Sequence, residues 1–141
     1  MSCQIRITDW DTDREALSAI RMTVFVDEQK VPEELELDEE DADAVHALAL
    51  DGDLPVGTAR LLPDGRIGRM AVLKSHRGSG VGAALLRALI DLAAQRGHHE
   101  LVLNAQLQAI GFYEHLGFCA YGGEFDDAGI PHRAMRLKLS R

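Results

Sequence analysis

The stretch from Arg69 to Leu86 constrains the fold more than any other part of the chain. An apolar segment leads through a short basic turn into the glycine loop Gly78–Gly82, and an amphipathic pattern follows directly. Glycines packed at such a junction indicate positive φ angles, close approach of another backbone, or both. Where such a loop opens a helix, its free N–H groups bind anions. The stretch therefore predicts a strand, an anion site and a helix in succession.

The chain before this stretch predicts a strand, a helical region and a hairpin. Residues 3–10 alternate between apolar and polar, which is typical of a half-buried strand. Thr12 and Glu15 have the spacing of a capping box, so we expect a helix to start at Thr12. Pro32 disfavours helical geometry in the residue before it, so we expect the helical region to end at Val31. A hairpin and a third antiparallel strand are then predicted over 44–51, 54–62 and 66–72.

The chain after the glycine loop predicts a crossover and a closing strand pair. From Val81 the apolar residues repeat at helical spacing, and Gly97 suits the position just after a helix end. The apolar strand 101–103 follows that helix, so we expect it to lie parallel to strand 66–72. We expect a second helix from about 107 to 116, with its packed side formed by Ala109, Phe112 and Leu116. The last strands are predicted over 118–125 and 132–139.

These elements together predict an α+β protein. Its central sheet is mixed and largely antiparallel, with one parallel strand pair and helices on both faces. The 141 residues suit one hydrophobic core, so we expect a single domain over 1–141.

Composition limits the partners and the compartment. The formal net charge of −8 argues against nucleic-acid or anionic-membrane binding, and it suits either a cationic small molecule or simple solubility. No apolar run approaches the length of a membrane span, and the polar N-terminus lacks a signal-peptide pattern. Cys3 and Cys119 lie far apart without a Cys-x-x-Cys motif. We therefore expect reduced thiols in the cytoplasm and no metal site, with Cys119 as a small core residue.

The segment 33–43 is strongly acidic, with Leu35 and Leu37 as its only large apolar residues. Such a run is usually a solvated loop. The alternative is a negatively charged wall beside an acceptor site, because the run falls between secondary-structure elements, where binding residues often lie. The sequence leaves both interpretations open.

Two motifs together resemble the GCN5-related N-acetyltransferases (GNAT). Arg77-Gly-Ser-Gly-Val-Gly82 fits the Arg/Gln-x-x-Gly-x-Gly/Ala loop of this superfamily, and Gly68–Val72 looks like the strand before that loop. Ala109–Phe118 looks like the second signature, Ala-x-x-Phe-Tyr-x-x-x-Gly-Phe. With the order of elements, the resemblance covers nearly the whole chain. The segment 24–32, the acidic run and His46 further resemble a subgroup of small, uncharacterised bacterial acyltransferases.

The resemblance implies a three-layer GNAT fold with a splayed parallel strand pair and a binding site for acetyl-CoA. The carrier's pyrophosphate would lie on the glycine loop, with positive charge beside it from Lys74, His76 and Arg77. One of these residues, or Arg69, would reach the ribose phosphate. The acetyl–pantetheine arm would pair with the backbone of Met70 and Val72, where one N–H group would polarise the thioester carbonyl. The implied carrier-binding residues are Met70, Ala71, Val72, Arg77, Gly78, Ser79, Gly80, Val81, Gly82, Asn104 and Tyr113. Asn104 or Gln106 would alternatively bind the acceptor.

The implied reaction is transfer of an acetyl group to the primary amine of a small, cationic acceptor. A phenol suits protonation of a departing thiolate, so Tyr113 is the candidate general acid, with its ring turned about 100° from that of Phe112 around the helix. The general base is open among Glu28, Glu36, His46 and His132. Glu28 is favoured, because in this family the first helical segments overlie the acceptor pocket.

Two alternatives remain beside this interpretation. The chain would also suit a non-catalytic acyl-CoA-binding sensor that keeps the fold. Arg21, Phe25, the acidic run and Arg60 resemble acyl-homoserine-lactone synthases, which implies an ion-pair cluster of Arg21, Asp38, Asp41 and Arg60, although the glycine loop favours the acetyltransferases. A homodimer is an open expectation, since such proteins often form one.

Overall fold

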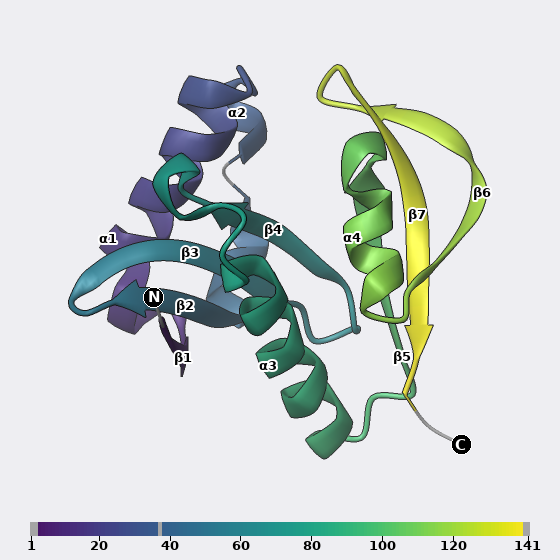
Figure 1. The fold of residues 1–141 in the computed structure, drawn as a ribbon, viewed down its shortest axis with the longest axis horizontal. Helices are drawn as coiled ribbons and strands as arrows, with labels where there is room; N and C mark the ends of the chain where they lie inside the picture. The colour runs from purple at the N-terminus through teal and green to yellow at the C-terminus, as the bar shows by residue number, and fades with distance from the viewer. Residues whose placement is uncertain (1–2, 37, 140–141) are drawn as a thin grey trace.

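The computed structural model describes residues 3–36 and 38–139, and within them the strands form two sheets that diverge from a shared edge (Figure 1). The first sheet is antiparallel and has the order β1 (Gln4–Thr8), β2 (Val45–Asp51), β3 (Leu54–Leu61) and β4 (Ile67–Val72). The second is also antiparallel, with β7 (Ile130–Lys138) between β5 (Glu100–Gln106) and β6 (Cys119–Asp127). The predicted α+β architecture is confirmed.

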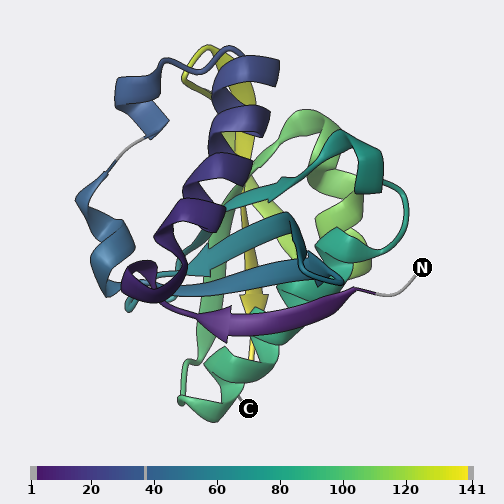
Figure 2. The same ribbon diagram turned by 90° about the vertical axis from the view of Figure 1, so that its left-hand side faces the viewer.

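Helices cover both faces of the first sheet (Figure 2). On one face, α1 (Trp10–Arg21) and the π-helical turn η1 (Met22–Glu28) pack Leu17, Ile20 and Val24 against Leu48 and Ala71. On the other face, α3 (Val81–Gln95) buries an aliphatic stripe of Val81, Leu85, Leu86, Leu89 and Ala93. Alternation along β2 explains this division, because Leu48 faces α1 whereas Ala47 and Ala49 belong to the core under α3.

The start of α1 differs from the sequence prediction. The helix begins at Trp10, because Asp9 is its N-cap and accepts a hydrogen bond from the Thr12 amide over 2.8 Å. Asp13 lies inside the helix with φ −123° and ψ 23°, so the axis bends there. The helical region ends at Glu28 rather than Val31, and Lys30 takes a positive φ of 64° before Pro32.

The parallel arrangement of β4 and β5 is confirmed, but among the described residues the pairing is confined to one isolated bridge just before β4. Arg66 and Val102 form a parallel bridge, and the Val102 amide donates to the Gly65 carbonyl over 3.1 Å. Beyond this point the two strands belong to different sheets and move apart (Figure 1). The backbone groups that β4 and β5 turn toward each other are therefore left for another partner.

A β-bulge re-aims the middle of β4. Thr58 of β3 lies opposite Ala71 and Arg60 opposite Gly68, so Ala59 faces two residues, Arg69 and Met70. Arg69 has a φ of 49°, a left-handed conformation that is strained for a residue with a side chain. The bulge removes Met70 from the regular ladder with β3 and leaves it beside the gap between the sheets.

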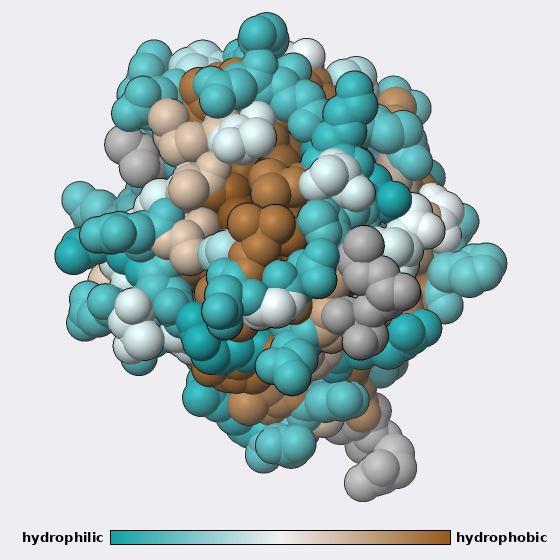
Figure 3. All heavy atoms as spheres, turned by 60° about the vertical axis from the view of Figure 1, so that its left-hand side comes forward, coloured by the Kyte–Doolittle hydropathy of each residue, from teal (hydrophilic) through white to brown (hydrophobic). Residues whose placement is uncertain are grey.

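The surface is largely polar on the side of α1 and the first sheet, with hydrophobic side chains gathered near the middle of that view (Figure 3). Among the described residues, no helix is both long and apolar enough to cross a membrane. Cys119 was expected in the core, but it is exposed on β6, because most of this edge strand faces solvent.

Candidate active site

The glycine loop joins the end of β4 to α3 through the short 3-10 turn η3 (Lys74–His76). Gly78 and Gly80 have φ angles of 80° and 87°, so the predicted positive φ angles are confirmed. Gly80 is the N-cap of α3 and supplies no side-chain cap, which leaves amide groups of the first helical turn without a partner of that kind. A Cβ atom placed on Gly78 or Gly80 would meet no atom within 4 Å. The loop therefore presents open space and N–H groups to an anion.

Side chains around η3 hold this loop to the sheet. Nε2 of His76 lies 2.9 Å from an Asp51 carboxylate oxygen, and its Nδ1 lies 2.7 Å from the Ser75 hydroxyl. Ser79, which was expected to contact the carrier, instead donates its hydroxyl to the His76 carbonyl over 2.7 Å and does not line the pocket. Lys74 is also outside the pocket lining. His76 and Ser79 thus shape the loop, because their polar groups are already used.

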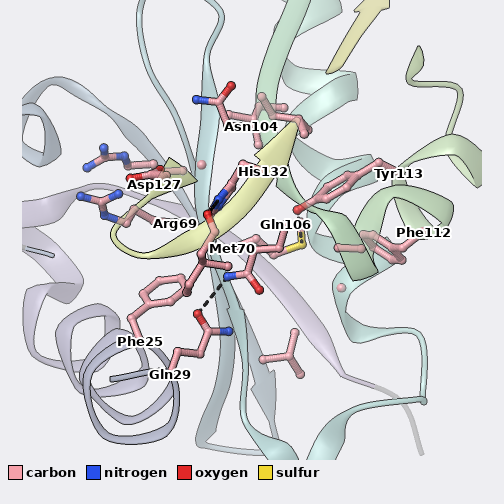
Figure 4. A pocket seen from close by; sticks show the side chains of 18 of the residues that line it. Phe25, Gln29, Arg69, Met70, Asn104, Gln106, Phe112, Tyr113, Asp127 and His132 are labelled. Atoms are coloured by element: carbon pink, nitrogen blue, oxygen red, sulfur yellow. Dashed lines mark hydrogen bonds between the residues drawn. The ribbon is translucent and has the colours of Figure 1, made fainter. Parts of the chain in front are cut away.

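A pocket of about 1090 Å³ fills the gap between β4 and β5 (Figure 4). The glycine loop forms one wall, and β4, β5, α4 (Ile110–His115) and η1 contribute the others. Ala71 does not line the pocket, since its side chain is 2% exposed and packs toward α1. The expected carrier-binding residues that the pocket does bring together are Met70, Val72, Arg77, Gly78, Gly80, Val81, Gly82, Asn104 and Tyr113.

Tyr113 points from α4 into this pocket (Figure 4). Its hydroxyl lies 3.9 Å from the sulfur of Met70, and its ring packs edge-on against Phe118. Burial raises the pKa of Tyr113 to about 12. The phenol therefore keeps its proton at neutral pH and can act as a donor.

Phe112 does not enter the core, contrary to the sequence prediction. Its side chain is 36% exposed, it lines the pocket, and its ring would lie 3.3 Å from a Cβ atom on Gly82. Helical periodicity placed Phe112 and Tyr113 on different faces, but the helix is rotated so that Tyr113 is the more buried ring. Gly82 is thus needed partly for the close approach of Phe112.

Glu28 lines the pocket, but its carboxylate is already bound. Arg77 donates to both of its oxygens over 2.6 and 2.7 Å. These hydrogen bonds lower the pKa of Glu28, which weakens it as a proton acceptor. The surroundings of Glu28 therefore argue against its predicted role as the general base. Arg77 is bound to Glu28 rather than free beside the loop.

Two other base candidates are also engaged. Glu36 is 3% exposed and forms an ion pair with Arg21. His46 is 1% exposed, and its Nε2 lies 3.0 Å from the Asp41 carbonyl. Burial lowers the pKa of His46 below its ordinary value of 6.5. Neither residue is in a position to exchange protons with a ligand, because each is covered and bonded.

The acidic run forms an ion-pair cluster, as the resemblance to the lactone synthases implies. Its two short helices are α2 (Glu33–Glu36) and the 3-10 helix η2 (Glu39–Asp43). Arg21 donates to both oxygens of Asp41 over 2.8 and 3.0 Å, and Arg60 bridges Asp38 and Asp41 over 2.8 and 2.9 Å. The interpretation as a solvated loop is wrong for Glu36, Asp38 and Asp41, since guanidinium groups offset the cost of burying these carboxylates.

Arg69 joins this cluster as a member that the sequence did not suggest. Its Nη2 donates to the Glu36 carbonyl and to Asp38, each over 3.0 Å. It was considered as a contact for a ribose phosphate, but the bulge directs its guanidinium to the acidic run. Burial alone would raise the pKa of Asp38, yet hydrogen bonds from Arg60 and the charges of Arg60 and Arg69 lower it to about 2.

The far end of the pocket is lined by polar residues of which the sequence prediction named only Asn104, Gln106 and His132. Gln106, at the end of β5, donates its side-chain amide to Gln29 over 2.9 Å. Phe25 was named only for the resemblance to the lactone synthases, and Gln29 and Asp127 were not singled out. These residues come from η1, the position after η1 and the end of β6, and they meet only in the folded chain (Figure 4). The Asp127 carboxylate has no hydrogen bond or ion pair to another described residue.

The comparisons with known proteins agree with this geometry. A family model described as an acetyltransferase (GNAT) domain matches residues 11–139. The uncharacterised N-acetyltransferase YjcF of Bacillus subtilis (strain 168) is 45% identical over 120 residues, which are 82% of this chain and 86% of that protein. A crystal structure of an acyl-CoA N-acyltransferase from Pseudomonas aeruginosa superposes with a TM-score of 0.86 at 28% identity, over 96% of this chain and 99% of that one.

The chain belongs to the GNAT acetyltransferase family. It is therefore an enzyme of acyl transfer, and the divergence of β4 and β5 lies where the family resemblance implies the acyl carrier. The sequence interpretation of the two motifs is confirmed at the level of the family and the fold.

Proposed function

We propose that the protein transfers the acetyl group of acetyl-CoA to the primary amine of a small, cationic acceptor. The observation that carries this proposal is the pocket that runs from the glycine loop, past the bulge in β4, to the hydroxyl of Tyr113. It brings an anion site, unpaired strand edges and a proton donor into one space. These are the three parts that thioester aminolysis on a pyrophosphate carrier needs.

The donor half of the proposal uses mainly main-chain groups. The pyrophosphate would accept hydrogen bonds from the amides of Gly78–Gly82 at the start of α3. The pantetheine arm would continue the sheet along β4, where Met70 lies outside the regular ladder. An amide of Met70 or Val72 would polarise the thioester carbonyl, and Tyr113 would protonate the departing thiolate. Asn104 at the end of β5 would bind the arm from the other side.

The acceptor half rests on the polar end of the pocket. Asp127 offers a carboxylate with no hydrogen bond or ion pair to another described residue, which supports an acceptor with positive charge. Gln29, Gln106 and Gln108 add amide donors and acceptors for a polar substrate. Phe25 supplies an aromatic wall on which an ammonium group can rest.

The test is release of coenzyme A thiol from acetyl-CoA across a panel of alkylamines, polyamines, amino sugars and peptides. With the best acceptor, Tyr113→Phe should lower kcat about 10²-fold or more while acetyl-CoA still raises the thermal midpoint. The control is Glu114→Gln, which lies next to Tyr113 on α4 but does not line the pocket. Tight binding without turnover of any amine would favour the sensor, and turnover only with an amino-acid-derived lactone precursor would favour the synthase.

The same proposal covers location and assembly. We propose one catalytic domain over residues 1–141 that acts in the cytoplasm, since Cys3 and Cys119 are both free thiols. A homodimer is a proposal that light scattering at assay concentration would test.

A further inference from the structure

We propose that His132 is the general base, with Nε2 taking the proton from the ammonium group of the acceptor. The inference rests on the proposed function, because it names the residue that activates the amine. Glu28, Glu36 and His46 are each bonded to another group. His132 is the remaining candidate among the four, and it lines the pocket.

The hydrogen bond of His132 sets its tautomer. Nδ1 lies 2.6 Å from the Ile130 carbonyl, and a carbonyl can only accept, so Nδ1 carries the hydrogen. In the neutral ring the lone pair is then on Nε2. Nε2 has no hydrogen-bond partner among the described residues, and His132 is not among those with a buried polar atom left unpaired. The free nitrogen is thus a proton acceptor that solvent or a ligand can reach.

Neighbouring strands hold the ring in place. His132 pairs with Gln106 of β5 on one side and with Phe125 of β6 on the other. Its ring stacks on Phe125 with centroids 5.9 Å apart and planes 25° apart, and the residue is 8% exposed. A ring held by packing and one hydrogen bond keeps its orientation without reorganisation when the amine arrives.

In Figure 4 the His132 ring lies in the pocket between Asp127 and Tyr113, at the end that we propose for the acceptor. Gln106 and Asp127 both line this pocket, and Tyr113 enters it from α4. Asp127 would draw the ammonium group toward this end. His132 on β7 would thus take a proton from the acceptor, whereas Tyr113 on α4 would give a proton to the thiolate.

The proton balance follows from these roles. Two protons leave the ammonium nitrogen as the new C–N amide bond forms. Nε2 of His132 takes the first, and the neutral amine attacks the thioester carbon. The C–S bond then breaks, Tyr113 protonates the thiolate, and the second amine proton restores the phenol. The imidazolium finally releases its proton to solvent, so that each turnover gives one amide, one thiol and one proton.

The test compares two acceptors in His132→Asn, whose side-chain amide can still donate to the Ile130 carbonyl. The probes are the alkylamine of the panel that the wild type acetylates fastest and p-anisidine, an arylamine that is already neutral at the assay pH. We expect kcat/KM for the alkylamine to fall about 10²-fold or more, and for p-anisidine by less than about tenfold. The ratio of the two activities does not depend on how much of the variant folds. His98→Asn, outside the pocket, is the matched control.

Three results would overturn the assignment. Equal losses with both amines would mean that His132 positions the pocket rather than removing a proton. Unchanged alkylamine turnover in His132→Asn would mean that another group, or water, is the base. Absence of any turnover by the wild type would remove the proposed function and this inference with it, whereas the first two results leave the proposed function intact.

Discussion

Arg77 donates hydrogen bonds from Nη1 and Nη2 to the two carboxylate oxygens of Glu28, over 2.6 and 2.7 Å. The pair joins η1, on the acceptor side of the pocket, to the glycine loop that forms the donor side. Nε of Arg77 also donates to the Val72 carbonyl over 2.9 Å, so its guanidinium is fixed at three points. Both side chains are 38% exposed, so the pair contributes at most about 1 kcal/mol.

Glu28→Gln should therefore have a small effect on turnover. The substitution removes the charge that neutralises Arg77, so we expect the KM for acetyl-CoA to fall by up to about fivefold as Arg77 becomes free for the pyrophosphate. We expect kcat to change by less than about tenfold, whereas loss of a general base costs about 10²-fold or more. Steady-state kinetics beside Asp27→Asn, an exposed neighbour outside the pocket, would measure both. A fall of about 10²-fold in kcat/KM for the alkylamine, as expected for His132→Asn, would restore Glu28 as the base.

Gly80→Ala should weaken the donor site and the fold together. Its φ of 87° is left-handed, so an alanine there costs about 1–2 kcal/mol, roughly 3–8 °C in thermal midpoint. The space around it is open, so the cost comes from the backbone rather than from a clash, and we expect the KM for acetyl-CoA to rise as the loop shifts. Gly111→Ala is the control, because Gly111 lies in α4 with open space and alanine should stabilise the helix by about 0.5–1 kcal/mol.

Asp38 should make the protein sensitive to acid. Its pKa of about 2 is below the ordinary value of 3.8, so the unfolded chain takes up a proton at higher pH than the folded chain. The stabilisation is complete about one pH unit above 3.8 and is lost as the pH falls toward 2, and the lowered pKa of Asp41 acts in the same direction.

Urea unfolding at several pH values would measure this effect. Asp38→Asn should lower the free energy of unfolding by about 1–2 kcal/mol at neutral pH and flatten its dependence between about pH 5 and 2. Asp53→Asn, in the exposed turn between β2 and β3, should change neither. An unchanged slope in Asp38→Asn would mean that other carboxylates carry the acid sensitivity.

Much of the donor site could be predicted from local patterns. The apolar spacing of α3, the glycines before it and the turn at Gly97 depend on neighbours in sequence, so the loop and the helix were placed correctly. The same holds for the hairpin of β2 and β3. The Phe112–Tyr113 pair marks the limit of this reasoning, because a helical period separates two side chains but does not say which one turns inward.

The sequence by itself determined the family, the order of elements and the anion loop, since periodicity and glycine conformations act over a few residues. Only the tertiary structure decided which titratable groups are free. Arg77 is 49 residues from Glu28 in the sequence, and Arg21 is 20 residues from Asp41. Both carboxylates are nevertheless bound by these arginines in the folded chain. Within residues 3–36 and 38–139, His132 has a single hydrogen bond, which is local, to Ile130, so its other ring nitrogen has no partner there, while its pocket is assembled from distant strands. Proton affinity depends on spatial neighbours, and those are set by packing rather than by spacing along the chain.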